Sequence, residues 1–209
     1  MFDPNLFLSS LAVLFVLIDP PGCAPVFATL TQGTSRAHQK AMAYRSVLVA
    51  AVILVGFTFG GEWVFDKLGI SLDALRIAGG IMLFIIGLNM VFERRTEKRE
   101  ARAEDILDEI EDPEDISVFP MGIPMIAGPG TMASLLILTA ETDGIGTWTI
   151  LAALVVVLVV TLISFLAAPA LMRLMGKSVT DVLTRVLGVL LATLAAQFIL
   201  DGVANALLA

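Results

Sequence analysis

Two stretches of this 209-residue chain contain no charged side chain, namely 116–140 and 144–172. Either stretch, as an α-helix, is long enough to cross the hydrocarbon core of a bilayer, about 30 Å thick. Hydrophobic residues make up 57% of the chain and charged residues 16%, a balance typical of membrane proteins. We therefore expect an all-α polytopic membrane protein with six transmembrane helices, at about 5–31, 43–65, 73–92, 116–139, 147–172 and 182–203.

An acidic segment divides the spans into two groups of three. Residues 93–115 contain 11 acidic and five basic side chains, so this segment cannot lie in lipid. The predicted organisation is a first three-helix repeat at 1–92, an acidic linker at 93–115 and a second three-helix repeat at 116–209. The formal net charge of -7 largely reflects the linker, and no basic surface indicates nucleic-acid binding.

The distribution of Lys and Arg predicts the orientation in the membrane. With both termini on one side, that side carries two basic residues and the opposite side carries eleven. Basic residues are enriched in cytoplasmic loops. We therefore expect a multi-pass protein of the cell inner membrane with a cytoplasmic linker and both termini outside, in the periplasm. The N-terminus has no basic segment before its apolar run, so we expect a retained first span and not a cleaved signal peptide.

The two halves resemble each other when the sequence is shifted by 108 residues. This shift places Pro21-Gly22 on Pro129-Gly130 and gives 15 identities over the 76 positions from 18 to 93. Two apolar stretches would match nearly as well by composition, but the polar and helix-breaking positions also coincide in one register. Because each copy has three spans, the second copy enters from the opposite face. The prediction is two inverted repeats, each with a broken first helix.

The breaks are Pro-Pro-Gly at 20–22 and Gly-Pro-Gly at 128–130. Proline removes an N–H donor and glycine permits unusual backbone dihedrals, so both tripeptides should interrupt their helices. Paired interruptions in inverted repeats are where secondary transporters place their binding sites, although a single kink more often serves packing. The candidate substrate-binding residues are Asp19, Pro20, Pro21, Gly22, Cys23, Pro25, Gly128, Pro129, Gly130, Thr131 and Ser134.

Asp19 is the one acid deep within an apolar span, and the repeat has Ala127 in its place. An ionisable residue inside the membrane indicates a functional role, here a proton carrier or a partner for an ammonium group. The alternative is a cap on the half-helix that follows, and the two roles are compatible. Asn89 and Gln197, near the ends of the third and sixth spans, are expected to support the site through interhelical hydrogen bonds.

Enzymatic chemistry has no visible basis in the sequence. One cysteine, Cys23, allows neither an intramolecular disulfide nor a cysteine-based metal cluster. No Ser/His, Cys/His or metal-ligand arrangement is apparent, so we expect neither an enzyme nor a cofactor. A non-transporting membrane scaffold or sensor stays open as an alternative to a carrier, as does an exporter of another small solute.

The chain resembles the MarC family of integral membrane proteins, which overlaps the six-span neutral amino acid transporter family. The resemblance lies in Asp-Pro-x-Gly-x-x-Pro-x-Phe from Asp19, IPMIAGPGTMA from Ile123, LRIAGGIMLFIIGLNMV from Leu75 and LATLAAQFILDGV from Leu191. It implies transport of small neutral amino acids such as glycine or alanine, coupled to an ion gradient with H⁺ or Na⁺ as candidates. The family usually has asparagine where this chain has Cys23, which bears on substrate choice. Direction of transport and oligomeric state stay open.

Overall fold

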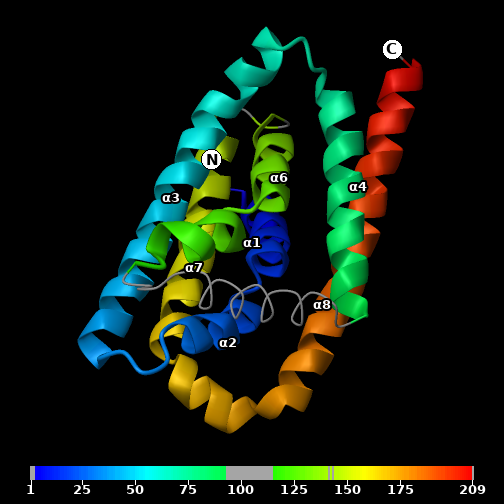
Figure 1. The fold of residues 1–209 in the computed structure, drawn as a ribbon. Helices are drawn as coiled ribbons and strands as arrows, with labels where there is room; N and C mark the ends of the chain where they lie inside the picture. The colour runs from blue at the N-terminus through cyan, green and yellow to red at the C-terminus, as the bar shows by residue number, and fades with distance from the viewer. Residues whose placement is uncertain (1–2, 93–114, 141, 143, 209) are drawn as a thin grey trace.

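A computed structural model describes residues 3–92, 115–140, 142 and 144–208, and these residues form helices without a single strand (Figure 1). The all-α prediction is confirmed. The linker predicted at 93–115 lies outside the described residues, except for Asp115. The helices are α1 (Pro4–Ile18), α2 (Pro20–Leu30), α3 (Arg36–Lys67), α4 (Leu72–Val91), the π-helix η1 (Ser117–Ile126), α6 (Pro129–Ala140), α7 (Gly144–Leu166) and α8 (Ala168–Leu208).

The described helices include candidates for the predicted spans. Five segments are long and apolar enough to cross a membrane: Pro4–Leu30, Arg36–Lys67, Leu72–Val91, Gly144–Leu166 and Val182–Leu207. The pair η1 and α6, which is bent by 53° at its break, makes a sixth if it is counted as one span. The prediction of an all-α polytopic membrane protein is therefore confirmed, with five or six candidate spans among the described residues.

The helix starts follow local sequence signals. Ser35 caps α3 by accepting a hydrogen bond from the backbone N–H of His38, and Ser71 caps α4 by accepting one from Ala74, both at 3.2 Å. Gly69, with φ +67°, makes the turn between α3 and α4. Helices α3 and α4 therefore each begin at a capped residue.

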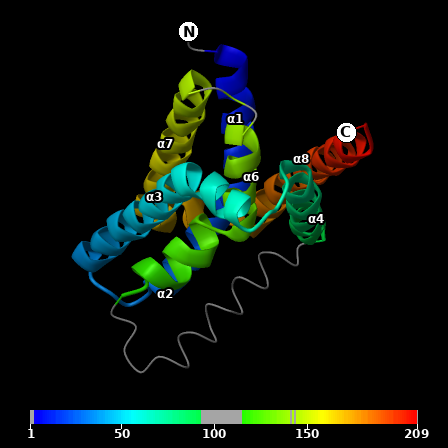
Figure 2. The same ribbon diagram turned by 90° about the horizontal axis from the view of Figure 1, so that it is seen from above.

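Helices α4 and α8 pack against each other along one side of the bundle (Figure 2). Glycines let their backbones approach closely. A Cβ atom added at Gly80 would lie 2.9 Å from the carbonyl oxygen of Ala195, and one added at Gly188 would lie 2.9 Å from that of Gly87. Residues later in α4 contact residues earlier in α8, so the two helices are antiparallel. A shift of 108 residues exchanges Gly80 with Gly188 and Gly87 with Ala195, so the two contacts are reciprocal.

The same reciprocity extends to the other helices. The pair α2 and α7 is matched by α6 and α3, the pair α1 and α7 by η1 and α3, and the pair α2 and α8 by α6 and α4. Each interrupted span thus packs on the long helix of the other half. The halves are interlocked, and the two breaks lie inside the bundle that results.

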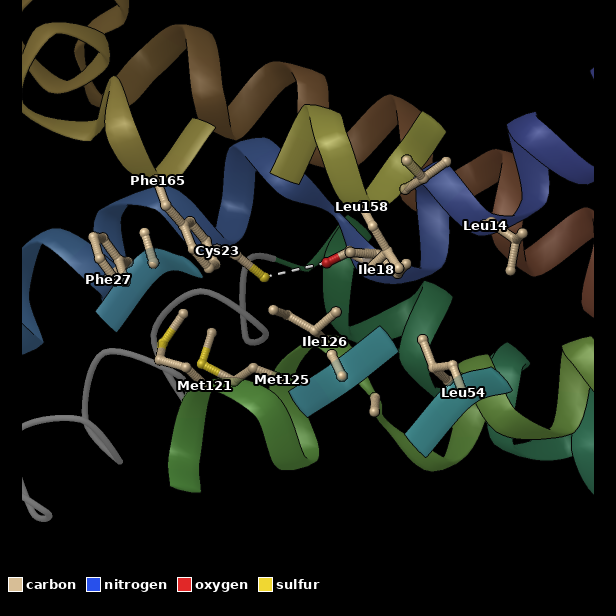
Figure 3. Close-up of a cluster of buried hydrophobic side chains, with 14 of the residues drawn as sticks. Leu14, Ile18, Cys23, Phe27, Leu54, Met121, Met125, Ile126, Leu158 and Phe165 are labelled. Carbon is tan, nitrogen blue, oxygen red and sulfur yellow. Dashed lines mark hydrogen bonds between the residues drawn. The ribbon is translucent and has the colours of Figure 1, made fainter. Parts of the chain in front are cut away.

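The main buried cluster surrounds the first break (Figure 3). It joins Leu14 and Ile18 of α1 to Cys23 and Phe27 of α2, and it reaches α7 through Phe165. The rings of Phe27 and Phe165 stack with centroids 4.6 Å apart and planes 1° from parallel. This packing fixes α2 against α7 about two helical turns beyond the break.

Candidate functional site at the two helix breaks

The first break is a single residue, Asp19, between α1 and α2. Its backbone is left-handed, with φ 55° and ψ 63°, and it is the one described non-glycine residue with positive φ. Aspartate tolerates this conformation better than most residues. Pro20 and Pro21 follow at helix positions whose N–H groups would lack partners in any case. The sequence therefore ends one helix and begins the next without an intervening loop.

The carboxylate of Asp19 folds back onto the start of α2. Its Oδ1 accepts a hydrogen bond of 3.2 Å from the N–H of Gly22, and the side chain is 2% exposed. A Cβ atom at Gly22 would lie 2.2 Å from Asp19 Oδ2, so only glycine leaves room for the carboxylate. The predicted cap is present, and a negative group occupies the positive end of α2.

In each half, the residue after the glycine of the break donates a hydrogen bond to a backbone carbonyl group just before the break. Cys23 Sγ donates to the carbonyl oxygen of Ile18 at 3.2 Å, and Thr131 Oγ1 donates to that of Ile126 at 3.3 Å. Both pairs span five residues, and a shift of 108 converts one into the other. The two breaks are therefore closed by equivalent hydrogen bonds, with sulfur in one half and oxygen in the other.

The second break is wider than the sequence indicated. Its interruption begins near Phe119 and not at Gly128, because η1 contains non-helical dihedrals at Phe119 and Ile123. Each of these residues precedes a proline, which disfavours the helical region. In the π-helix, the N–H of Ala127 bonds to the carbonyl oxygen of Gly122 at 2.9 Å, five residues back. Pro120 and Pro124 were the available signals, and the prediction did not use them.

A cavity of about 110 Å³ lies at this second break. Gly128, Pro129, Gly130 and Thr131 form one side of it, and these four were predicted site residues. Sequence reasoning missed the other lining side chains, which come from three elements: Leu17 of α1, Ile86 of α4, and Pro124 and Met125 of η1. Leu17 and Met125 are themselves equivalent under the shift of 108, so residues preceding both breaks meet at this cavity.

The remaining predicted site residues lie elsewhere. Asp19, Pro20, Gly22 and Cys23 are buried, Pro21 and Pro25 are half-buried, and none of these six lines the cavity. Asn89 is half-buried on α4, outside the cavity lining. Gln197 is exposed, and its Nε2 donates to Asp201 Oδ1 at 2.7 Å within α8. The structure therefore places neither supporting residue at the break.

Among the described residues, two buried hydroxyl groups have no hydrogen-bond partner, those of Ser134 on α6 and Ser10 on α1. Several other buried hydroxyls in described helices bond to the carbonyl oxygen four residues back, for example Ser46 to Met42 and Thr161 to Val157, both at 2.8 Å. Ser134 lies one helical turn after Gly130 and hence on the same face of α6. The unsatisfied hydroxyl of Ser134 therefore lies on the face of α6 that carries Gly130, one helical turn beyond the cavity.

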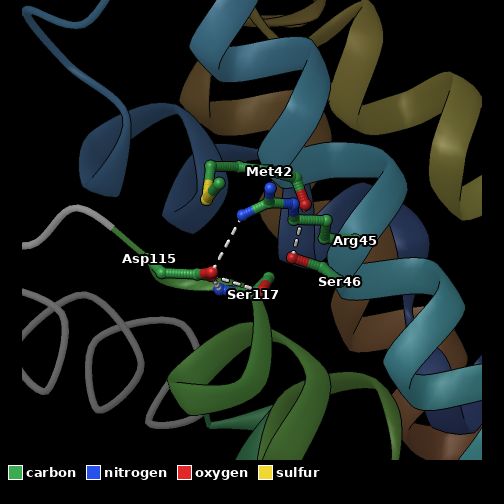
Figure 4. A network of polar contacts seen from close by, with 5 residues as sticks. All are labelled: Met42, Arg45, Ser46, Asp115 and Ser117. Atoms are coloured by element: carbon green, nitrogen blue, oxygen red, sulfur yellow. Dashed lines mark hydrogen bonds and ion pairs between the residues drawn. The ribbon is translucent and has the colours of Figure 1, made fainter.

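A polar network holds the start of η1 against α3 (Figure 4). Arg45 Nη1 lies 3.1 Å from Asp115 Oδ2, and Asp115 Oδ1 accepts hydrogen bonds from the hydroxyl and the N–H of Ser117. These bonds from Ser117, followed by the charge of Arg45, lower the pKa of Asp115 below the ordinary carboxyl value. The contacts among Arg45, Asp115 and Ser117 tether the second break to α3. The sequence of the first break has no equivalent of this tether.

Comparisons with known proteins agree that the chain is an integral membrane protein. Residues 4–207 match a family described as MarC family integral membrane protein. The chain is 33% identical over 210 residues to a UPF0056 membrane protein of Methanocaldococcus jannaschii, covering 99% of this chain and all of the relative. It is 34% identical over 187 residues to the UPF0056 membrane protein YvbG of Bacillus subtilis, covering 89% and 88%, and 28% identical over 200 residues to the UPF0056 inner membrane protein YhgN of Escherichia coli K12, covering 95% and 96%. No solved structure matched the chain.

Proposed function

Because the chain belongs to the MarC family of integral membrane proteins, we propose that it is a secondary transporter of small neutral amino acids, such as glycine or alanine. The observation that carries the proposal is the cavity at the second break, which adjoins the start of α6. The first four N–H groups of a helix lack intrahelical partners and form its positive end. A ligand carboxylate suits that place.

The first break supports the proposal that a carboxylate binds at the start of a half-helix. At Gly22 the N–H at the start of α2 receives the carboxylate of Asp19. The shift of 108 residues puts Ala127, two residues before α6 begins, in the place of Asp19, and the side chain of Ala127 contains no acceptor. One half thus supplies its own carboxylate, and the other half has a cavity beside the corresponding N–H groups. A substrate carboxylate there would repeat the interaction that Asp19 makes in the first half.

The size of the cavity limits the substrate. Pockets for drug-sized ligands span about 300–1,000 Å³, whereas this one is about 110 Å³, which is room for a few waters at roughly 30 Å³ each. Its walls, from Leu17, Ile86, Pro124 and Met125, offer no charge. A small neutral solute fits these limits, and the hydroxyl of Ser134 is a polar group within one turn of the site.

The reciprocal contacts support inverted repeats. If a twofold rotation exchanges two antiparallel helices, the rotation axis is perpendicular to both helices. When the helices span a membrane, this axis lies in the membrane plane. The contacts of Gly80 with Ala195 and of Gly188 with Gly87 have this reciprocity. Alternating access would then expose the second break to each side of the membrane in turn. We further propose H⁺ or Na⁺ coupling, a cytoplasmic linker and outward-facing termini in the cell inner membrane.

Uptake into proteoliposomes tests the transport function. Labelled glycine and alanine should accumulate against their gradient when a proton or sodium gradient is imposed, and efflux measured from preloaded vesicles would identify an exporter. Absence of flux in both directions with every neutral amino acid tested would instead favour a scaffold or sensor.

A pair of glycine variants connects flux to the cavity. Gly130→Leu places a side chain among Ile86, Leu83 and Leu17, whose terminal atoms lie 3.0 to 3.7 Å from an added Cβ. Gly144→Leu meets nothing within 4 Å. We expect Gly130→Leu to remove substrate-induced thermal stabilisation and uptake, and Gly144→Leu to retain both. Equal behaviour of the two variants would contradict a site at the second break.

Membrane orientation has a separate test. In a Cys23→Ser background, a cysteine at Thr34 should be shielded from an impermeant thiol reagent in intact cells, while one at Leu68, in the loop at the other end of α3, should react. The reverse labelling pattern would overturn the proposed orientation.

A further inference from the structure

A second pocket, of about 240 Å³, lies away from the breaks, where α3 begins and α7 ends. Arg36, Gln39 and Lys40 of α3 form its polar side. Phe165 and Leu166 of α7, with Ala170 of α8, form its apolar side. None of these residues lines the cavity at the second break, so the pocket is a separate site.

The two cations of this pocket have no acidic partner among the described residues. Arg45 is paired with Asp115 and Arg76 with Asp73, but neither Arg36 nor Lys40 lies within ion-pair distance of a described carboxylate. Residues four apart lie on one helix face, where like charges repel. An anion between Arg36 and Lys40 would relieve this repulsion and could accept hydrogen bonds from both side chains.

The position of the pocket favours a membrane lipid over a dissolved ion. Arg36 is the first residue of a spanning helix, so the basic side lies where the apolar span begins. From Leu166 an exposed apolar stripe continues along α7 through Ile163 and Val159, with exposed fractions of 40%, 57% and 48%. Residues spaced by three and four share a helix face. An acyl chain can follow this stripe while its headgroup remains at the cations.

We propose that this pocket binds the phosphate headgroup of an anionic membrane lipid, with Arg36 and Lys40 contacting the phosphate and the acyl chain lying along α7. Basic pockets between helices on the positively charged side of a membrane protein favour anionic headgroups. The proposal concerns binding at this pocket alone and does not depend on transport.

The pocket also touches the helix that follows the first break. Phe165 stacks on Phe27 of α2, and Gln39 Nε2 donates to the carbonyl oxygen of Thr31, the residue that ends α2, at 3.1 Å. A lipid that orders Phe165 and Gln39 therefore also restrains α2. Lipid binding is expected to raise the thermal stability of the whole protein, because the folded state alone presents this pocket.

Thermal unfolding of the purified full-length protein in neutral detergent tests the proposal. Phosphatidylglycerol should raise the melting temperature, whereas phosphatidylcholine and inorganic phosphate should not. The double variant Arg36→Gln, Lys40→Gln should lose most of the shift. Lys67→Gln, at the other end of α3, removes one charge outside the pocket and should retain the shift.

Three results would overturn the assignment. Equal shifts with phosphatidylglycerol and phosphatidylcholine would mean that charge is not recognised. A full shift with inorganic phosphate alone would indicate a small-anion site without a lipid. A double variant with an unchanged baseline melting temperature and an undiminished lipid shift would place any lipid elsewhere.

Discussion

The two helix breaks are closed by equivalent hydrogen bonds, but they differ in backbone conformation and in what occupies the start of the second half-helix. At the first break, Asp19 directs its carboxylate to the N–H of Gly22 and is sealed from solvent. At the second break, Ala127 stands in the place of Asp19, and a cavity adjoins Gly130. Equivalent bonds from Cys23 and Thr131 close both breaks. This difference is the basis of our proposal that substrate binds at the second break.

The largest expected effect separates the two glycines. Gly22→Ala should lower the free energy of unfolding by about 2–3 kcal/mol, because its Cβ would overlap the Asp19 carboxylate and force the cap to move. Gly130→Ala should cost less than about 1 kcal/mol, since its nearest neighbours are the mobile ends of Ile86 and Leu83. Chemical or thermal unfolding in detergent measures both. Equal losses would mean that the breaks are packed alike.

The next effect concerns Asp19 itself. Asp19→Ala should cost about 2 kcal/mol, because it removes a cap and places alanine in a left-handed conformation. Asp19→Asn keeps an accepting oxygen and tolerates this conformation, so its stability should stay within about 0.5 kcal/mol of the wild type.

Transport by Asp19→Asn then isolates the role of the charge. If Asp19 carries a proton or contacts the substrate ammonium, the variant should fold normally but lose concentrative uptake. Accumulation at the wild-type level by a well-folded Asp19→Asn protein would leave the residue with a capping role alone.

A smaller effect compares the two bonds that close the breaks. Thr131→Val removes the hydroxyl that donates to Ile126 and should cost about 1 kcal/mol. Cys23→Ala removes a weaker S–H donor to Ile18 and should cost less at the hydrogen bond, although it also leaves a small void. Cys23→Ser is the matched variant, because it replaces the S–H donor with an O–H donor. Equal stability of Cys23→Ser and the wild type would show that either donor can close the first break.

The smallest effect is at the tether of the second break. The pKa of Asp115 is lowered in the folded protein, so its stabilising contribution is present above the ordinary carboxyl pKa of about 3.9 and is lost as pH falls through the lower folded value. Both partners of this ion pair are exposed, so the contribution is small. Asp115→Asn should slightly lower the melting temperature at pH 7, and the difference should vanish at the acid end. A difference independent of pH would exclude the carboxylate as its cause.

The breaks illustrate what the sequence predicts and what it does not. Uncharged runs and the tripeptides at 20–22 and 128–130 predicted the spans and the interrupted helices, because apolar length and missing donors act locally. The cap by Asp19 was also predictable, because an aspartate side chain just before a helix start has few other hydrogen-bonding partners than the first N–H groups of that helix.

The cavity lining was not predictable in the same way. Leu17 and Ile86 look like ordinary apolar residues in their own helices, and only tertiary packing brings them to Gly130. The width of the second break depended on Pro120 and Pro124, whose effect on the preceding residues produces a π-helix that a pattern of apolar spacing does not reveal.

The most direct measurement of the central claim is glycine and alanine binding by Ala127→Asp, which gives the second break the residue of the first. The new carboxylate should occupy the start of α6, and affinity should fall at least about tenfold. Ala127→Ser, which adds a small uncharged side chain, is the control for crowding, and melting temperatures identify misfolded protein. We expect Ala127→Asp to fold and to lose most of its affinity for glycine and alanine, while Ala127→Ser keeps its affinity. Unchanged binding by a folded Ala127→Asp protein would contradict it.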